Sequence, residues 1–530
     1  MIMQLFRRGA LRCYHVYNPY VRMTCPISDD VTARESDISR SHAATDARPF
    51  NEIPGPKSLP LIGTLWNYVP VFGKYNFERL HHNGKKKLQE YGPLVREEIV
   101  PGVFLVWVFT PSDIENVFRN EGRYPERRSH LALQKYRSDH PNIYNSGGLL
   151  PTNGPEWWRL RSEFQQVLSR PQSVKLYLPQ IDQVIQEFID HINTWTQSAG
   201  KYQDFSDELS RLYLELICLV TFDVQLGSLS DSERQKGSLS SQLLEASLTT
   251  NSSILATDNG PQLWRWVETR LYRKLKKSQK FMEQIAVDFI SKKKESLTQS
   301  ASTGSDTKSL LELYLSSEEL DIKDVTGMAM DMLLAGIDTT TYTTSFALYH
   351  LAVNPEAQNK LYEESCRLLV KPSCAITTSV LAKAQYTKAV LKETFRMNPI
   401  SVGIGRILAE DTIFSGYCVP KGTVVVTQNQ VSCRQAEYFT DPDKFVPERW
   451  IKSHPLYKQV SPYLVLPFGH GPRSCIARRL AEQNMHSVIL KLIRHYEIGW
   501  NGGVLDCRSY LINKPDKPLY LTFKERSKVC

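Results

Sequence analysis

The chain has 530 residues, of which 41% are hydrophobic and 10% aromatic, so it can bury a large core and does not have the composition of a disordered protein. Its formal net charge of +9 is modest for this length and indicates a basic protein rather than a nucleic-acid-binding one. A C-x-x-C pair is a spacing typical of zinc sites. The ten cysteines form no such pair, so no zinc site is predicted.

The composition of the first 28 residues indicates the cellular compartment of the protein. The first 28 residues hold short apolar pieces and four arginines but no acidic residue: Arg7, Arg8, Arg12 and Arg22. An Arg-rich, acid-free, amphipathic start is typical of a mitochondrial transit peptide, and an unstructured leader of chance composition is the alternative. No run of about 18 consecutive apolar residues is present, so no membrane-spanning anchor is expected. We therefore predict a mitochondrial transit peptide and disordered leader over 1–48 and a single domain over 49–530.

The rest of the chain is mostly helical in pattern. The Pro- and Gly-rich stretch from Ile53 to Gly63 predicts an extended entry segment. Two runs rich in β-branched and aromatic residues, Val95–Ile99 and Val103–Phe109, flank Pro101-Gly102 and predict a hairpin. Helical spacing dominates residues 170–297 and recurs in several later segments, and the fold class predicted is mainly α with a smaller β region. The expected helical segments are 113–120, a helix opening at 156, 170–297 with breaks at 200, 227 and 259–261, 322–353 and 388–396.

Two tryptophans precede a dense cationic run. Trp264 and Trp266 stand shortly before the run from Arg270 to Lys280. Aromatic residues beside Lys and Arg suit the interfacial layer of a membrane. A solvated helix whose tryptophans enter the core explains the pattern equally well, and the sequence leaves both interpretations open.

The loop from Phe468 to Ala477 contains a candidate reactive cysteine. Two glycines and a proline within five residues predict a tight loop, and Cys475 stands where this loop enters a helix. First-turn N–H groups and the helix dipole favour a thiolate there, and Arg473 adds positive charge. A buried, inert cysteine beside a turn is the alternative.

Three helical segments carry further candidates. Trp157 and Arg161 are four residues apart and share a face, so both can reach one anionic group, although a surface packing pair is the alternative. In Ala335-Gly-Ile-Asp-Thr-Thr340, the Thr339 hydroxyl can compete for the carbonyl of Ala335 and open the helix, with the Asp338 carboxylate nearby; small residues that pack helices are the alternative. A third pair, Glu393 and Arg396, can form an ion pair within one helix, which on a surface is worth only a few tenths of a kcal/mol.

The loop resembles a known family. Phe468, Gly471, Arg473 and Cys475 fit the haem loop of the cytochrome P450 monooxygenases, Phe-x-x-Gly-x-Arg-x-Cys-x-Gly, and the chain resembles that family from Ile53 to Phe523. Ala477 departs from the pattern because it stands where the family usually has glycine. The resemblance implies the cytochrome P450 fold, with haem b (iron protoporphyrin IX) between a long distal helix and the proximal Cys loop.

The resemblance also implies roles for the candidate residues. Cys475 would be the axial ligand of the haem iron, and the propionates would be held by Trp157, Arg161, Arg406 and Arg473, with Phe468 and Gly471 forming the loop. Thr339 and Asp338 would be the catalytic pair that supplies protons in the oxygen-binding groove. A structural network would join Glu393, Arg396 and Arg449.

The implied reaction inserts one oxygen atom from O2 into a C–H bond of a steroid, and the other oxygen leaves as water. The chain lacks a flavin or nicotinamide fingerprint, so its electrons are expected from a separate partner. The resemblance to the mitochondrial members of the family implies that this partner is a two-iron (adrenodoxin-like) ferredoxin, reduced by NADPH through a reductase. Four basic residues would form the docking site for this ferredoxin: Lys388, Lys392, Arg478 and Arg479. The expected location is peripheral, on the matrix side of the inner mitochondrial membrane.

Two segments narrow the resemblance further. Leu150–Arg161 and Phe468–Asn484, with Ala477 included, are similar to insect mitochondrial enzymes of moulting-hormone synthesis, which implies hydroxylation of an ecdysteroid precursor at carbon 22. A mitochondrial monooxygenase for another sterol or a xenobiotic is one alternative. Another is a haem-binding sensor or carrier without turnover, and a third is a cysteine hydrolase with His470 as the base.

Overall fold

The computed structural model describes residues 47–198, 204–259, 262–299 and 308–526. The chain divides into two units, Met1–Ala47 and Arg48–Cys530. Except for Ala47 and Arg48, the predicted leader at 1–48 lies outside the described residues. The helices and strands all belong to the unit from Arg48 onward.

Helices make up most of this unit, and the strands are short. The helices are α3 (Leu80–Tyr91), α4 (Pro111–Arg119), α5 (Leu131–Ser138), α6 (Gly154–Leu168), α7 (Pro171–Lys175), α8 (Leu178–Ser198), α9 (Phe205–Phe222), α10 (Asp231–Arg234), α11 (Leu239–Asn259), α12 (Arg270–Gln299), α13 (Leu310–Leu315), α14 (Ile322–Val353), α15 (Pro355–Leu368), α16 (Thr378–Lys383), α17 (Gln385–Met397), α18 (Asn429–Ser432) and α19 (Arg478–His495). The strands are β1 (Leu94–Val100), β2 (Val103–Val108), β3 (Gly405–Ile407), β4 (Thr412–Phe414), β5 (Tyr417–Val419), β6 (Val424–Thr427), β7 (Tyr496–Trp500), β8 (Cys507–Ser509), β9 (Asn513–Pro515) and β10 (Leu521–Glu525). Short 3₁₀ turns are η1 (Phe50–Glu52), η2 (Leu65–Tyr68), η3 (Leu263–Arg265) and η4 (Pro447–Trp450).

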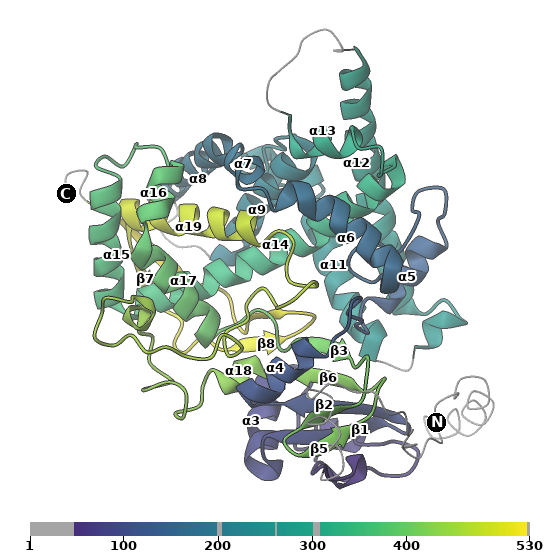
Figure 1. The fold of residues 1–530 in the computed structure, drawn as a ribbon. Coiled ribbons are helices and arrows are strands. Elements are labelled where there is room, and N and C mark those ends of the chain that lie inside the picture. The colour runs from purple at the N-terminus through teal and green to yellow at the C-terminus, as the bar shows by residue number, and fades with distance from the viewer. Residues whose placement is uncertain (1–46, 199–203, 260–261, 300–307, 527–530) are drawn as a thin grey trace, which may run out of the picture. The chain divides into compact units, whose positions relative to one another are not determined.

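The predicted mainly α fold class is confirmed, and so is the predicted hairpin. Strands β1 and β2 pair in antiparallel fashion, with Leu94 opposite Val108. The larger sheet has the order β1-β2-β6-β3, in which β6 runs parallel to β2 and antiparallel to β3. Figure 1 shows this sheet on one side of the unit, next to α3, α4 and α18, and most of the other helices gathered on the other side. Chain segments that are about 300 residues apart thus meet in one sheet, which positions β3 close to the loop that carries Cys475.

The central element is α14, which has the bounds predicted from the sequence. Asp321 caps its first turn by accepting from the N–H groups of Lys323 and Asp324, and the helix ends at Asn354 before Pro355. Most of its residues are buried, and it crosses the middle of the helical layer (Figure 1). Gly336 allows α9 to approach closely, because a Cβ there would lie 2.7 Å from a carbon of Ile217.

The two tryptophans near α12 each fit one of the two interpretations left open by the sequence: Trp264 enters the core, and Trp266 stays exposed. Trp264 is 5% exposed, and its Nε1 donates to the carbonyl of Thr257 at 3.0 Å. Trp266 is 70% exposed and stands beside exposed Leu263 and Val267. Within the described part of the chain, no helix has the length and apolar character needed to cross a membrane.

Candidate functional site

The loop before α19 is held by its own backbone. The N–H of Cys475 donates to the carbonyl of Phe468 at 2.7 Å, and that of Ser474 donates to the carbonyl of Gly471 at 3.0 Å. Gly471 has a φ of +70°, and a Cβ there would lie 2.1 Å from Oε1 of Glu121. Glycine is required at this position because a side chain would meet both backbone strain and the Glu121 carboxylate.

The Cys475 side chain is accessible from outside the protein, but many protein atoms lie around its thiol. This burial raises its pKa, while a hydrogen bond from the Ala477 N–H and the charges of Arg161 and Arg478 act in the opposite direction. Burial and the helix-end position thus act on the pKa of the Cys475 thiol in opposite directions, and the thiolate stays a prediction. A coordinated metal removes the thiol proton outright, so the raised pKa does not disqualify Cys475 as a ligand.

Three guanidinium groups lie close enough to Arg473 to act on its charge, and we call Arg127, Arg161, Arg406 and Arg473 the arginine cluster. Burial, followed by repulsion from the other three, lowers the pKa of Arg473 to about 8. The pKa values of Arg127 and Arg161 are each lowered to about 10, mainly by burial. Among the described residues, the cluster makes one ion pair, between Arg406 Nε and Glu121 Oε2 at 2.6 Å. The cluster therefore carries excess positive charge inside the protein.

Arg473 lies against the helix that supplies two other predicted residues. Its Cζ is 4.2 Å from the centre of the Trp157 ring, and its Nη2 donates to Thr152 and Asn153, the residues just before α6. Its Nε and Nη1 have no hydrogen-bond partner within the described residues. Arg161 and Arg478 are the arginines whose charges lower the pKa of the Cys475 thiol, whereas the Arg473 guanidinium lies against Trp157 of α6. The expectation that Arg473 also supplies charge to this thiol stays a prediction.

These residues fit a haem group. A haem carries two propionates, and two anionic groups would offset the repulsion within the arginine cluster and satisfy the unpaired N–H groups of Arg473. The thiol of Cys475 is accessible for an axial bond, and thiolate haem ligation uses this donor. The residues that would hold the group are thus Cys475 for the iron and the arginine cluster, with Trp157, for the propionates.

Two members of this site were missed by the sequence analysis. Arg127 precedes α5 and donates from Nε and Nη2 to the carbonyl of Leu150, at 3.2 and 2.6 Å. Glu121 follows α4 and pairs with Arg406 of β3, 285 residues later. A charged residue in a loop carries no local pattern that marks it, so only the tertiary arrangement identifies these two.

The distal candidates lie in α14. The Thr339 hydroxyl donates to the carbonyl of Ala335 at 2.7 Å, as the spacing indicated, but the helix continues without a break through this turn. Asp338 is buried and accepts from Nδ2 of Asn251 in α11 at 2.8 Å. This burial raises the pKa of Asp338 to about 6. Asn251 is a further residue that the sequence did not mark.

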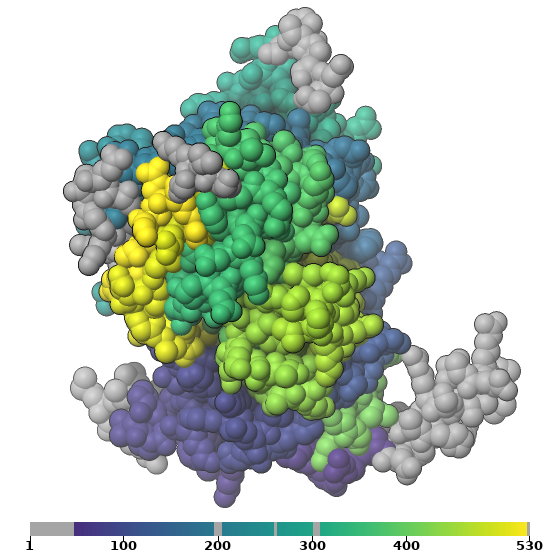
Figure 2. Space-filling model, turned by 90° about the vertical axis from the view of Figure 1, so that its left-hand side faces the viewer, coloured from purple at the N-terminus to yellow at the C-terminus, as the bar shows by residue number. Residues whose placement is uncertain are grey.

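Glu393, Arg396 and Arg449 form a fully paired network. The Arg396 guanidinium donates to both oxygens of Glu393, at 2.9 and 2.8 Å, and Arg449 Nε donates to the same carboxylate at 3.1 Å. The remaining Arg396 donors reach the carbonyls of Cys433, Pro442 and Lys444. Figure 2 shows the yellow-green segment directly against the green one. Arg449 belongs to η4 and Glu393 to α17, so the network joins these two elements.

The four basic residues predicted for partner docking are exposed: Lys388, Lys392, Arg478 and Arg479. We call this set the basic face. The two helices that carry it, α17 and α19, are neighbours. This follows from the pKa of Lys392, which is lowered mainly by burial and in addition by repulsion from Arg478. The Arg478 guanidinium also lies 5.4 Å from the centre of the Phe468 ring, so the basic face borders the Cys475 loop.

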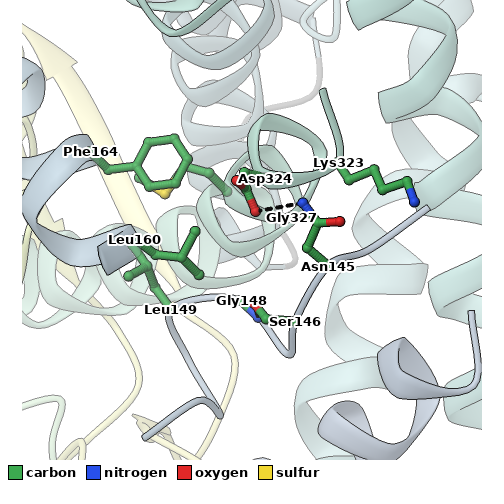
Figure 3. A pocket seen from close by; sticks show the side chains of 10 residues that line it. Asn145, Ser146, Gly148, Leu149, Leu160, Phe164, Lys323, Asp324 and Gly327 are labelled. Atoms are coloured by element: carbon green, nitrogen blue, oxygen red, sulfur yellow. Dashed lines mark hydrogen bonds between the residues drawn. The ribbon is translucent and has the colours of Figure 1, made fainter. Parts of the chain in front are cut away.

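Two other features do not belong to this site. The small pocket in Figure 3 is lined by the start of α14, by α6 and by the segment 145–149, where Asn145 donates to Asp324 at 3.1 Å across it. None of its lining residues is a predicted site residue. The His470 ring packs against Phe118 and Tyr463, with centroid distances of 5.2 and 5.1 Å, which does not suit the base of a cysteine hydrolase.

Comparisons with known proteins agree with the geometry. The sequence model of the family "Cytochrome P450" matches residues 53–523. The chain is 48% identical over 489 residues to "Cytochrome P450 302a1, mitochondrial" of Drosophila melanogaster, covering 92% of this chain and 97% of the relative. It is 31% identical over 506 residues to "Probable cytochrome P450 301a1, mitochondrial" of the same organism, covering 94% and 91%.

An accessible cysteine beside a buried arginine cluster and a family match over nearly all of the described residues point to the same conclusion. The chain belongs to the cytochrome P450 family, and it is a monooxygenase.

Proposed function

We propose that this monooxygenase hydroxylates a steroid, and specifically an ecdysteroid precursor at side-chain carbon 22. The observation that carries the proposal is the similarity of Leu150–Arg161 and Phe468–Asn484, including Ala477, to the insect mitochondrial enzymes of moulting-hormone synthesis. The 48% identity to a mitochondrial P450 of Drosophila over 92% of the chain supports it.

In this proposal Cys475 ligates the iron, and Trp157 and the arginine cluster orient the haem through its propionates. Bound haem supplies the activation of O2 that inserts one oxygen atom into a C–H bond. Asp338 holds a proton at its buried carboxyl group, because its pKa of about 6 leaves a protonated fraction near neutral pH. Asn251 fixes the orientation of that carboxyl group through Oδ2.

The decisive experiment is incubation of the haem-loaded enzyme with a 22-deoxy ecdysteroid, ferredoxin, ferredoxin reductase and NADPH. We expect a product that is one oxygen atom heavier, with the hydroxyl group located on carbon 22 by fragmentation and NMR. Turnover of other sterols or xenobiotics, with the ecdysteroid left unchanged, would identify the alternative mitochondrial monooxygenase. NADPH consumption that no substrate stimulates would instead favour a sensor or carrier.

We also propose that electrons arrive from a two-iron ferredoxin, reduced by NADPH through its reductase, and that this ferredoxin docks on the basic face. The basic face borders the loop that holds Cys475, which gives electrons a short path to the haem. An acidic partner is attracted there by charge complementarity, so its association should weaken as salt rises.

Replacing both Lys388 and Lys392 with Gln should raise the apparent Michaelis constant for ferredoxin by roughly tenfold, at about 1 kcal/mol or less per charge. Substrate binding, followed by the spectral shift of the haem, should stay unchanged. Lys57→Gln is the matched control, because Lys57 is an exposed lysine of the entry segment. An unchanged Michaelis constant in the double variant would remove the docking assignment.

The proposed location is the matrix side of the inner mitochondrial membrane, with peripheral contact through the exposed apolar residues Leu263, Trp266 and Val267. Arg265 and Arg270 flank them, and basic residues favour anionic lipid. In flotation with cardiolipin-containing vesicles, Trp266→Ser should lower the bound fraction. Val504→Ser should not, although the Val504 side chain is 79% exposed.

A further inference from the structure

A cluster of metal-binding side chains lies where the β8–β9 hairpin meets the start of α3, and it takes no part in the haem site. It consists of His81 and His82 of α3 and of Asp506 and Cys507 at the start of β8, and we call it the His81–Cys507 cluster. Ligand atoms of His81, Asp506 and Cys507 all lie within 4.8 Å of one another. From these positions we propose that the chain binds one Zn²⁺ ion through His81, Asp506 and Cys507, with His82 at its edge.

The distances match those between ligands of one zinc ion. Zinc bonds of 2.0–2.3 Å in a tetrahedron set neighbouring ligand atoms about 3.3–3.8 Å apart. Nε2 of His81 lies 3.1 Å from Oδ1 of Asp506 and 3.8 Å from Sγ of Cys507. Nε2 of His82 lies 3.2 Å from Oδ2 of Asp506. Small side-chain movements therefore suffice for one ion to bond to all three principal ligands.

The backbone holds the ligands in place without the metal. The N–H of Ser509 donates to the carbonyl of Glu78 at 2.8 Å, and the N–H of Leu80 donates to the Ser509 hydroxyl at 3.2 Å. These bonds join the first turn of α3 to β8, the two elements that supply the histidines and the Asp-Cys pair. Such prior positioning lowers the entropic cost of assembling a metal site.

Surrounding groups would support the bound metal. Nε2 of Gln430 donates to Cys507 Sγ at 3.3 Å, and such N–H···S bonds stabilise a thiolate ligand. Arg79 donates to both Asp506 and Asp516, at 3.0 and 2.9 Å. With the thiol deprotonated, two carboxylates and one thiolate oppose one guanidinium, which leaves two negative charges for the two positive charges of zinc.

The ligand set selects the metal class. Thiolate and imidazole donors together favour Zn²⁺ over Mg²⁺ or Ca²⁺, which prefer oxygen ligands only. Cys507 is buried and His81 largely so, whereas Asp506 and His82 reach solvent, so the site has a path for entry. Zinc binding replaces the thiol proton of Cys507, so one proton is released for each ion bound.

Bound zinc would fasten the hairpin to α3. The loop between β8 and β9 packs its Leu511 and Ile512 against the main hydrophobic core, to which α14 also contributes. Lys514 of β9 lies close enough to Asp338 to act on its carboxyl group. The hairpin thus extends from the zinc ligands at its base toward the distal side of the haem site.

The test is equilibrium dialysis of the haem-loaded enzyme against Zn²⁺, with zinc and iron counted by mass spectrometry. We expect about one zinc per haem, and at least a tenfold weaker affinity in Cys507→Ser and in His81→Gln. X-ray absorption at the zinc edge should show one sulfur ligand at about 2.3 Å in the wild type and none in Cys507→Ser.

Controls separate this site from incidental binding. Cys374→Ser and His454→Gln change a cysteine and a histidine outside the cluster and should bind zinc as the wild type does. His82→Gln alters the exposed edge of the cluster, so it remains informative if Cys507→Ser does not fold, and it should weaken binding several-fold. Zinc that binds equally to all variants, a spectrum without sulfur, or no binding at all would overturn the proposal.

Discussion

The Glu393 network and the arginine cluster are both built from buried arginines, yet their charges are balanced in opposite ways. In the Glu393 network the carboxylate accepts from Arg396 and Arg449, and it also accepts from Nε1 of Trp450 at 2.8 Å. In the arginine cluster four guanidiniums meet with one direct ion pair, and Arg473 keeps two nitrogens without a partner among the described residues.

The difference separates groups that hold the fold from groups that wait for a ligand. A buried charge that is paired within the protein needs nothing further, whereas an unpaired one is costly unless something of opposite charge joins it. The buried carboxyl group of Asp338, which is bonded to the neutral side chain of Asn251, also falls on the unpaired side. The arginine cluster and Asp338 are residues that we propose for the binding of haem and O2.

The largest effect expected is that of Cys475→Ala, which removes the proposed ligand of the haem iron. The long-wavelength Soret band of the reduced carbon monoxide complex, which reports thiolate ligation, should disappear, and hydroxylation should fall to background. Cys433→Ala changes a buried cysteine outside the loop, whose Sγ contacts the carbonyl of Leu464, and should keep the band. A band that survives in Cys475→Ala would contradict the assigned ligand.

Replacing one arginine of the Glu393 network and one of the arginine cluster tests the comparison directly. Arg396→Met leaves Glu393 with a buried, less compensated charge and should lower the free energy of unfolding by about 3–5 kcal/mol. Arg473→Met removes a group repelled by three others, so the haem-free protein should lose no more than about 1–2 kcal/mol for the broken hydrogen bonds.

The same two variants should differ in haem retention. Arg473→Met removes N–H groups that would meet the propionates, so transfer of haem to an acceptor such as apomyoglobin should become faster at a given protein stability. Urea unfolding and haem transfer measure the two quantities separately. Equal losses of stability in both variants would show that the two sets of arginines do not differ in kind.

The pH dependence of stability tests Asp338. Its pKa rises from 3.8 to about 6 on folding, so the folded state binds the proton more tightly than the unfolded state does. Its contribution is fully present below about pH 4 and is lost as the pH rises through about 6, and each tenfold difference in proton affinity is worth about 1.4 kcal/mol. Relative to Asp338→Asn, the wild type should therefore lose about 1–3 kcal/mol between these pH values. Urea unfolding of both proteins at several pH values measures the difference, and parallel curves would contradict the assignment.

Two neighbouring threonines allow a smaller, matched comparison. Thr339 and Thr340 both donate to the carbonyl four residues earlier, at 2.7 and 2.6 Å, but Thr340 is buried and Thr339 is partly exposed. If Thr339 helps to supply protons to O2, Thr339→Ala should raise hydrogen peroxide release per NADPH consumed several-fold. Thr340→Ala should leave that ratio near the wild-type value. Peroxide and NADPH are measured together, and equal ratios in the two variants would remove the catalytic role of Thr339.

Local patterns in the sequence predicted the elements, and their limits explain what was missed. The bounds of α14 and the pairing of β1 with β2 follow from periodicity and turn residues, which act over a few positions. Contacts such as Glu121 with Arg406, or His81 with Asp506 across 425 residues, depend on how distant segments meet. The absence of a C-x-x-C pair accordingly says nothing about a metal site assembled by the fold.

Local sequence also does not predict how deeply the folded protein buries a given side chain. Cys475 shows this, because its helix-end position favours a thiolate while the enclosing protein raises the pKa of the thiol. Arg473 shows the same limit, because it is only two residues from Cys475 along the chain, yet its guanidinium contacts Trp157 of α6. Residue type and spacing thus located the loop but did not show which groups surround its side chains.

The smallest effect expected is that of Ala477→Gly, which restores the residue usual in the family. Ala477 is the N-cap residue of α19 with a φ of −92°, a conformation open to any residue, so glycine gives no relief from strain. Its N–H donates to Cys475, and this bond does not depend on the side chain. Stability should change by no more than about 0.5 kcal/mol, and the Soret band of the carbon monoxide complex should keep its position. A shifted band would mean that the methyl group touches the haem and tunes its seating.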